Sequence, residues 1–439
     1  MRLLTAIILS VIILASGCAT TSSVPAEPVP PLARNTSLPP APEGGYTWRN
    51  LLDLVLETNQ DHNALLAKAR AEYFRYKSRT DPNEPQFSVE YSYLSDDRRN
   101  GDYDFGFRLP IPNPFLNRHI VRTGEAAQRE AETESEAFRH ELASIIYEFV
   151  QGALIGEREL SILRLREQVL SERTTYMETR YNVRMATQAD MRELDIQRLR
   201  LKADIQRAQY AAQAARRGLQ ILVQIPDEQL VLKPTSTDWE AQLAALENDQ
   251  ALIDEACSRS AELSGAIAAY EKACATLDTA RARQIPWFNS IYVTYSPSST
   301  NDTYVSSTTG QIVTSTRRLH HWTLGVSVNL PVFAWFSAEK KQANAEIETA
   351  SLQIAGIRQR VRKEVTWMIG DLRDTLKFLI EFQSIYDSIP EPTREAIPDL
   401  ESYYKILDTR LSASEHVIKM EEQYASIYRN LLKLTGGWD

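Results

Sequence analysis

The fold is decided by residues 86–111, which read QFSVEYSYLSDDRRNGDYDFGFRLPI. Apolar and polar side chains alternate on both sides of a charged turn, and this alternation is the pattern of β-strands whose two faces meet different surroundings. One face of these strands carries Glu90, Asp104 and Arg108 among small polar residues. The stretch therefore predicts a hairpin over 85–110 with one apolar face, formed by Phe87, Val89, Tyr91, Tyr93, Tyr103, Phe105, Phe107 and Leu109.

The same pattern returns in the second half of the chain. Pro85 aligns with Pro286, an offset of 286 minus 85, or 201, residues, and Leu109-Pro110-Ile111 is matched by Leu330-Pro331-Val332. The connection of this second hairpin, 298–319, is longer and rich in serine and threonine. Its apolar face, over 286–331, comprises Trp287, Ile291, Val293, Tyr295, Trp322, Leu324, Val326, Val328 and Leu330, interrupted by Asn289. The repetition predicts an internal duplication of helix, hairpin, long helix and return helix.

The four strands have the length of membrane-crossing strands. Each has about 9–11 residues, enough to cross a bilayer when tilted, and aromatic residues gather toward the ends, as they do at membrane interfaces. The alternative is a small soluble sheet, but the charged opposite face suits a wet lumen and no segment looks like a covering layer. Because the smallest membrane barrels have about eight strands, several chains must combine. The predicted lipid-facing residues are Phe87, Val89, Tyr91, Tyr103, Phe105, Phe107, Ile291, Val293, Leu324, Val326 and Val328.

The remaining sequence is mostly helical. Over 115–181, apolar residues recur every three or four positions and charged residues fill the other faces, which indicates a helix of about 100 Å. The return helix, 188–224, and the leading helix of the second copy, 248–284, are each about 55 Å long. The first copy has its own leading helix at 48–80. We expect the long helix to pack against the two shorter ones stacked end to end, with 226–247 as a connection at mid-height.

The composition excludes several classes of protein. The 439 residues carry 49 Lys and Arg against 58 Asp and Glu, a net charge of −9, which disfavours nucleic-acid binding. Glycine-rich phosphate loops, nucleophile elbows and metal-ligand motifs are absent from the sequence, and His320-His321 is the nearest approach to a metal site. We therefore expect no enzyme, no cofactor and no metal.

The first residues form a targeting signal and are not part of the folded protein. A charged start, the apolar run LLTAIILSVIILA over 3–15 and then Ser16-Gly17-Cys18 form the pattern of a secretory signal peptide, residues 1–17. The small residues before Cys18 resemble the lipobox of bacterial lipoproteins, which implies acylation of Cys18, for example by palmitate; the alternative is an ordinary signal peptide with a chance cysteine. The proline-rich residues 18–46 predict an extended tether.

Together these features resemble the TolC-like outer-membrane factors over roughly residues 46–439. The resemblance rests on the duplicated hairpins, on RYNVRMATQAD at 180–190, which is similar to the family's Arg-Tyr-x-x-Gly-x-x-Ser-x-x-Asp, and on LTGGW at 434–438. It implies a mainly α-helical protein and a homotrimer. Three chains with four strands each would form a twelve-stranded β-barrel above a periplasmic tunnel of long antiparallel coiled-coil helices. The two copies would be 47–225 and 248–439, joined by an equatorial connection at 226–247.

The resemblance also implies that two helix–helix turns at the far end of the tunnel contact a periplasmic adaptor or act as a gate. Thr187 and Asp190 also have the spacing of a helix cap, and plain capping is the alternative for each such residue. Position 184 is arginine where the family has glycine, and the prolines between 390 and 398 predict that the second long helix, from about 337, kinks or loops out before its tip. The implied tip residues are Arg184, Thr187, Asp190, Arg410, Leu411, Ser412 and Glu415.

The implied function is a passive exit duct in the outer membrane of a Gram-negative bacterium. An inner-membrane pump and its periplasmic adaptor would hand over substrates, which would leave the cell through the trimer embedded in outer-membrane lipid. The lipobox favours small-molecule efflux over protein secretion by family analogy. The alternative function is a lipid-anchored periplasmic coiled-coil adhesin or scaffold without a pore.

Overall fold

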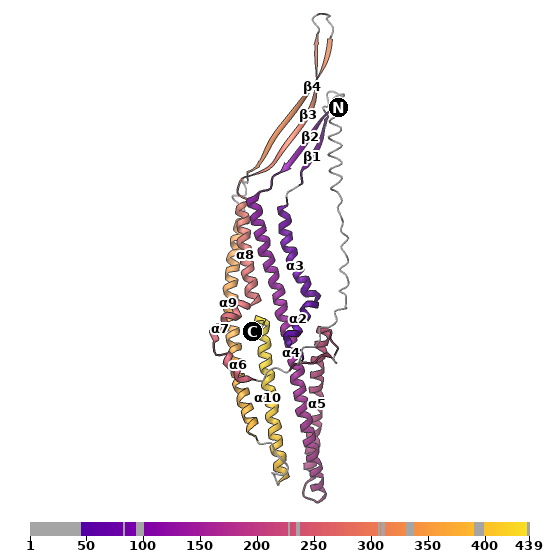
Figure 1. The fold of residues 1–439 in the computed structure, drawn as a ribbon, viewed down its shortest axis with the longest axis vertical. Coiled ribbons are helices and arrows are strands. Elements are labelled where there is room, and N and C mark those ends of the chain that lie inside the picture. Colours follow the sequence, from indigo (N-terminus) through magenta and orange to yellow (C-terminus); the bar gives the residue numbers. More distant parts are fainter. Residues whose placement is uncertain are drawn as a thin grey trace.

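The molecule is a long rod of helices with a twisted sheet at one end (Figure 1). The computed structural model describes residues 45–81, 84–93, 101–226, 229–233, 238–305, 308, 312–330, 338–389 and 399–436. The helices are α2 (Trp48–Thr58), α3 (Gln60–Lys77), α4 (Pro114–Asn182), α5 (Gln188–Val223), α6 (Trp239–Ala245), α7 (Asp249–Arg259), α8 (Ala261–Ala282), α9 (Ala338–Ser388) and α10 (Leu400–Thr435). The prediction of a mainly helical fold is confirmed.

Helix α4 runs the whole length of the rod (Figure 1). It begins where Pro114, whose fixed backbone angle suits the first helical position, follows the N-cap Asn113. The Asn113 side chain accepts hydrogen bonds from the backbone N–H groups of Phe115 and Leu116. Helix α5 packs beside the half of α4 that lies away from the sheet, and α3 and α8 pack beside the half near the sheet. The long helix thus packs against α5 and α8, as the helix lengths predict.

The leading helix of each copy is broken after its first 11 residues, although the helical pattern of the sequence continues through both breaks. Asn59 ends α2 and caps α3, because its side chain accepts a hydrogen bond from the backbone N–H of His62 at 2.9 Å. Ser260 separates α7 from α8 in the same way, accepting from the backbone N–H of Leu263 at 3.4 Å. The two breaks are 260 minus 59, or 201, residues apart, so the duplication extends to the caps.

The four strands form one antiparallel sheet in the order β1-β2-β3-β4. They are β1 (Gln86–Tyr93), β2 (Gly101–Pro110), β3 (Trp287–Val305) and β4 (Ile312–Asn329). The expectation that 298–319 is mostly a connection is wrong, because β3 and β4 pair as far as Val305 and Ile312. The threonine, valine and isoleucine residues of this stretch are β-branched and favour extended structure.

Strand β3 carries a bulge at Asn289, where its pairing with β4 shifts register. One extra residue reverses the side-chain alternation that follows it. Phe288, which pairs with Val328, therefore lies on the apolar face, and the expectation that Trp287 lies there is wrong. The Trp287 ring centroid lies 5.6 Å from that of Phe115, at the start of α4.

The buried core forms two main clusters, one for each copy of the repeat. The first joins α2, α4 and α5 and contains Leu51, Ile146 and Leu219, which are fully buried. The second joins α7, α9 and α10, with Val365, Leu376 and Leu431 at its centre. Both clusters lie near mid-height, so the two copies are stabilised at the same level of the rod.

Helices α4 and α5 approach each other closely at Gly156. A Cβ atom at this position would lie 2.9 Å from the Ala212 Cβ and 3.2 Å from its Cα. By contrast, a Cβ at Gly356 on α9 would meet nothing within 4 Å. The two glycines thus have opposite relations to their surroundings although both lie inside helices.

We expect Gly156→Ala to lower the melting temperature, because overpacking costs about 1–3 kcal/mol and outweighs the gain of about 1 kcal/mol from helix propensity. Gly356→Ala, the matched control, should leave it unchanged or raise it. Circular dichroism during thermal unfolding measures both. Equal melting temperatures for the two variants would contradict the close approach of α4 and α5.

Candidate functional sites: the strand faces and the helical tip

The apolar residues of the four strands lie in rows across one face of the sheet. One row runs from Val89 to Phe105, Tyr295 and Trp322 through consecutive register pairs. The residues named from the sequence as lipid-facing all share this face: Phe87, Val89, Tyr91, Tyr103, Phe105, Phe107, Ile291, Val293, Leu324, Val326 and Val328. Leu324 is 75% exposed and Trp322 70% exposed in the single chain. An apolar surface of this extent needs a cover of lipid or protein.

The opposite face of the sheet is polar and shaped by two glycines. Glu90 pairs with Asp104 across β1 and β2. Gly106 lies against Ser88, where a Cβ would come within 2.4 Å of the Ser88 hydroxyl oxygen. Gly325 leaves room for the Tyr292 ring in the same manner. The two faces therefore suit an apolar and an aqueous medium respectively.

The sheet ends in two open edges. β1 and β4 are its outer strands, and in the described residues neither has a strand partner on its outer side. Unpaired strand edges bind further strands readily. The single chain is thus incomplete as a sheet.

The first of the two helix–helix turns joins α4 to α5 at the end of the rod far from the sheet (Figure 1). Thr187 and Asp190 form a full capping box: the Thr187 backbone N–H and hydroxyl donate to the Asp190 carboxylate at 2.7 and 2.8 Å, and the Asp190 N–H donates to the Thr187 hydroxyl oxygen at 3.3 Å. These bonds hold the pKa of Asp190 below its usual value. Arg184 has φ = +62°, the left-handed conformation that favours glycine.

The second turn does not lie where the sequence analysis placed it. Arg410, Leu411, Ser412 and Glu415 lie inside α10, beginning ten residues after its first residue, and Leu411 is buried. The reason is that proline cannot continue a helix: α9 ends at Ser388, and α10 begins only after Pro398. The turn between α9 and α10 is therefore at 389–399, of which residues 390–398 lie outside the described part.

No family model and no curated protein sequence matches the chain, but several solved structures do. A membrane protein from Pseudomonas aeruginosa matches at 17% identity, with 89% of this chain and 93% of that chain covered and a TM-score of 0.61. The outer membrane protein VceC from Vibrio cholerae matches at 14% identity, with 89% and 96% covered and a TM-score of 0.59. The CmeC outer membrane channel of Campylobacter jejuni matches at 14% identity, with 89% and 85% covered and a TM-score of 0.53.

The chain has the fold of the TolC-like outer-membrane channels. About nine-tenths of this chain and of each matched chain are covered, so the helical rod and the sheet are matched together. The family resemblance drawn from the sequence motifs is confirmed at the level of the fold. The left-handed Arg184 also explains why the corresponding position of the family motif is a glycine.

Within this channel fold, ion pairs join α4 to α10 along the lower half of the rod. Glu421 of α10 is 5% exposed, and its carboxylate lies 2.6 Å from the Arg158 guanidinium. Burial raises the pKa of Glu421, and Arg158 opposes the rise. Local sequence patterns do not reveal this seam of ion pairs, because the paired residues are far apart in the chain. The other pairs are Arg166 with Asp408 (3.0 Å) and with Glu415, Arg180 with Glu401 (3.4 Å) and Arg429 with Glu148 (2.7 Å).

The described part of the channel fold contains no group of three His, Cys, Asp or Glu residues placed to hold a metal ion. His320, noted in the sequence, instead lies beside Tyr295, with 2.7 Å between its Nδ1 and the tyrosine hydroxyl. Over the same residues, no helix is long and apolar enough to cross a membrane. Cys18 and the signal peptide lie outside the described residues, as do Pro331 at the end of the second hairpin and Trp438 of the C-terminal motif.

We expect Arg184→Gly to stabilise the first tip of the channel fold. A non-glycine residue in the left-handed region costs about 1–2 kcal/mol, which glycine avoids. The neighbouring Val183 has φ = −91°, so Val183→Gly should instead destabilise the turn. Hydrogen exchange of the amides at the start of α5, compared between the two variants, measures the effect. Faster exchange in Arg184→Gly than in the unmodified protein would contradict the strained backbone.

Proposed function

We propose that the chain is one protomer of a trimeric outer-membrane exit duct. The observation that carries the proposal is the four-stranded sheet with an apolar face, a polar face and two open edges. Lipid covers an apolar face only if every backbone group of the sheet is paired, so β1 of one chain would pair with β4 of the next. Three copies would close a barrel of twelve strands, well above the minimum of about eight.

The helices support the same assembly. The side of α5 opposite α4 exposes a stripe of large apolar residues, and Ile221 on it is 77% exposed. These positions fall within about 60° of one another on a helix, so they form a single unpartnered face. In the proposed trimer this face packs on the neighbouring chain. The stripe consists of Ile196, Leu199, Tyr210 and Ile221.

The strands indicate where the bilayer ends. On the outward side of β4 the apolar residues run from Val328 up to Trp322, followed by His320. β3 and β4 continue beyond the Pro297–His320 pair for eight further pairs, from Ser298–Leu319 to Val305–Ile312, about 27 Å of hairpin. We place this extension outside the cell, the sheet in the outer membrane of a Gram-negative bacterium and the helical rod in the periplasm.

A lipid anchor at Cys18 fits this orientation. Tyr46 pairs with Leu232 at mid-height, where the described chain begins. From there α2 and α3 rise about 45 Å toward the sheet. The roughly 27 residues between Cys18 and Gly45 are rich in proline and can extend about 80 Å, so they are long enough to reach the membrane from mid-height. We propose acylation at Cys18, with 1–17 as signal peptide and 18–46 as tether.

The tips would receive the partners. Arg184, Thr187 and Asp190 at the first turn, with 389–399 at the second, are the proposed contact or gate for a periplasmic adaptor and inner-membrane pump. The caps at Asn59 and Ser260 support the proposed division into repeats 47–225 and 248–439, joined by 226–247. Energy would come from the partners.

The alternative, a lipid-anchored adhesin or scaffold without a pore, leaves the apolar face of the sheet unexplained. Chemical cross-linking of the purified protein and its conductance in planar lipid bilayers separate the two functions. We expect cross-linked trimers and ion-conducting pores. A monomer that leaves the membrane without detergent and gives no conductance would contradict the duct.

Two neighbouring residues of β4 test the orientation of the sheet. We expect Leu324→Arg to impair membrane insertion strongly, because arginine on the lipid side near mid-bilayer costs about 2–4 kcal/mol. Thr323→Arg, one residue away on the opposite face, should insert normally and change the conductance of the pore. The heat-resistant trimer on gels and the conductance report the two effects. Equal insertion of both variants would overturn the assigned faces.

A further inference from the structure

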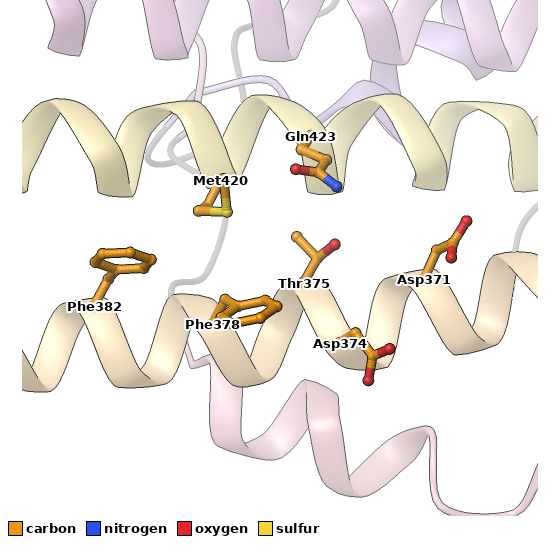
Figure 2. A pocket seen from close by; sticks show the side chains of 7 residues that line it. All are labelled: Asp371, Asp374, Thr375, Phe378, Phe382, Met420 and Gln423. Atoms are coloured by element: carbon orange, nitrogen blue, oxygen red, sulfur yellow. The ribbon is translucent and has the colours of Figure 1, made fainter.

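A groove with two cavities runs along α9 near mid-height. Its lower part, about 320 Å³, lies between α9 and α10, and Figure 2 shows Phe378 and Phe382 of α9 beside Met420 of α10, with Asp371 farther along α9. Its upper part, about 540 Å³, is lined by Trp367 and by residues of α4, α8 and α10. Asp371 lines both parts. Volumes of this order accommodate small organic molecules.

The groove lies on the side of α9 opposite to the side that contacts α7. Arg362 and Arg373 of α9 form ion pairs with Asp254 and Asp249 of α7. At about 100° per residue, Trp367, Asp371 and Phe378 lie about 140–180° around the helix from Arg362. In the proposed duct an extra helical layer inside the wall would block the lumen, so α6 and α7 lie outside. The groove therefore faces the lumen.

Aromatic rings and carboxylates lie together along this face. Trp367 is 72% exposed and Phe378 53% exposed, although both are large apolar side chains on a polar helix. The aromatic rings do not contribute to the core, whose α9 residues lie on another side of the helix. Exposed tryptophan and phenylalanine present their ring faces, which attract cations.

The carboxylates in the groove are mostly not neutralised. Among the described residues Glu141, Glu364 and Asp371 have no ion pair, and Asp374 has only Lys377, at 3.7 Å. Glu262 is paired with Arg360, and Lys433 is the one basic residue in the linings of the two cavities. The groove therefore combines apolar rings with an excess of negative charge.

We propose that this groove binds lipophilic organic cations, molecules that carry a positive charge on an aromatic or other apolar frame, as they pass through the lumen. Trp367 and Phe378 contact the apolar frame, and Asp371, shared by both parts of the groove, faces the charge. This inference rests on the proposed duct and specifies its substrate class. Anions of the same size are disfavoured by the same carboxylates.

Fluorescence anisotropy tests the proposal on the purified trimer in detergent. The probes are the cationic dye rhodamine 6G and the similarly sized anionic dye carboxyfluorescein. We expect rhodamine 6G to bind, with Trp367→Ala and Asp371→Asn each weakening it about fivefold or more. Both positions are exposed, so the variants fold. Leu352→Ala and Glu348→Gln, exposed on the same helix nearer the sheet, are the matched controls and should bind as the unmodified protein does.

Equal binding of the two dyes, or unchanged rhodamine 6G binding in both groove variants, overturns the proposed groove. Conductance of the same preparation in planar bilayers keeps the two proposals separate. Open pores without dye discrimination overturn the groove and leave the duct intact. A preparation without pores or trimers overturns the duct, and dye binding by such a monomer would overturn the assignment of the groove to a lumen.

Discussion

A sheet with two open edges has no stable place in hydrocarbon, because each backbone N–H or C=O left unpaired there costs several kcal/mol. The rest of the proposed assembly depends on this constraint. The described residues of one chain contain only the strands β1 to β4, so the sheet edges are paired only when copies of the chain meet. The helices below must then arrange themselves as a ring under a ring of strands. Such a ring requires the apolar stripe on α5, because a helix at the edge of one chain packs against the next chain once the ring closes.

The wall of the proposed duct has a second requirement. The half-length helices of each chain must stack end to end without a gap. The structure meets it at mid-height, where α5 and α10 both end in a left-handed residue, Gln224 with φ = +58° and Gly436 with φ = +72°. At Gly436 the fit is tight: a Cβ would come within 2.4 Å of the Nε2 atom of His140. Burial at this junction lowers the pKa of His140 to about 4, so the ring is neutral at physiological pH and packs as an uncharged side chain.

The sequence predicts the parts of this fold that depend on local periodicity. Alternation located both hairpins, and the three-to-four spacing located α4 to within two residues at each end. Local periodicity does not predict features that depend on one extra residue or on a single helix cap. The bulge at Asn289 moved Trp287 to the other face, and the break at Ser260 divides a segment whose helical pattern is unbroken.

The second tip shows how a motif match can mislead. Ser412 and Glu415 have the spacing of a capping box, but a spacing becomes a cap only where the helix begins. Here the prolines at 390–398 decide the boundary, since they end one helix whatever follows. The carboxylate of Glu415 is used elsewhere, in the ion pair with Arg166. Glu415 therefore belongs to the seam between α4 and α10, and Arg410 lies over the Tyr386 ring of α9.

In the proposed duct, that seam would limit how the two tips move. If α9 and α10 swung away from α4, Glu421 would lose Arg158, and a carboxylate that is 5% exposed would be left buried without a counter-charge until water reached it. Separating this partly buried pair costs more than separating the more exposed Arg180–Glu401 pair nearer the tip, because exposed pairs are worth little. The resistance to separation is therefore greater at Glu421 than at Glu401 near the tip. A movement that opens the tips meets the least resistance when it is confined to the last turns below Arg166, and the upper seam then acts as its fixed end.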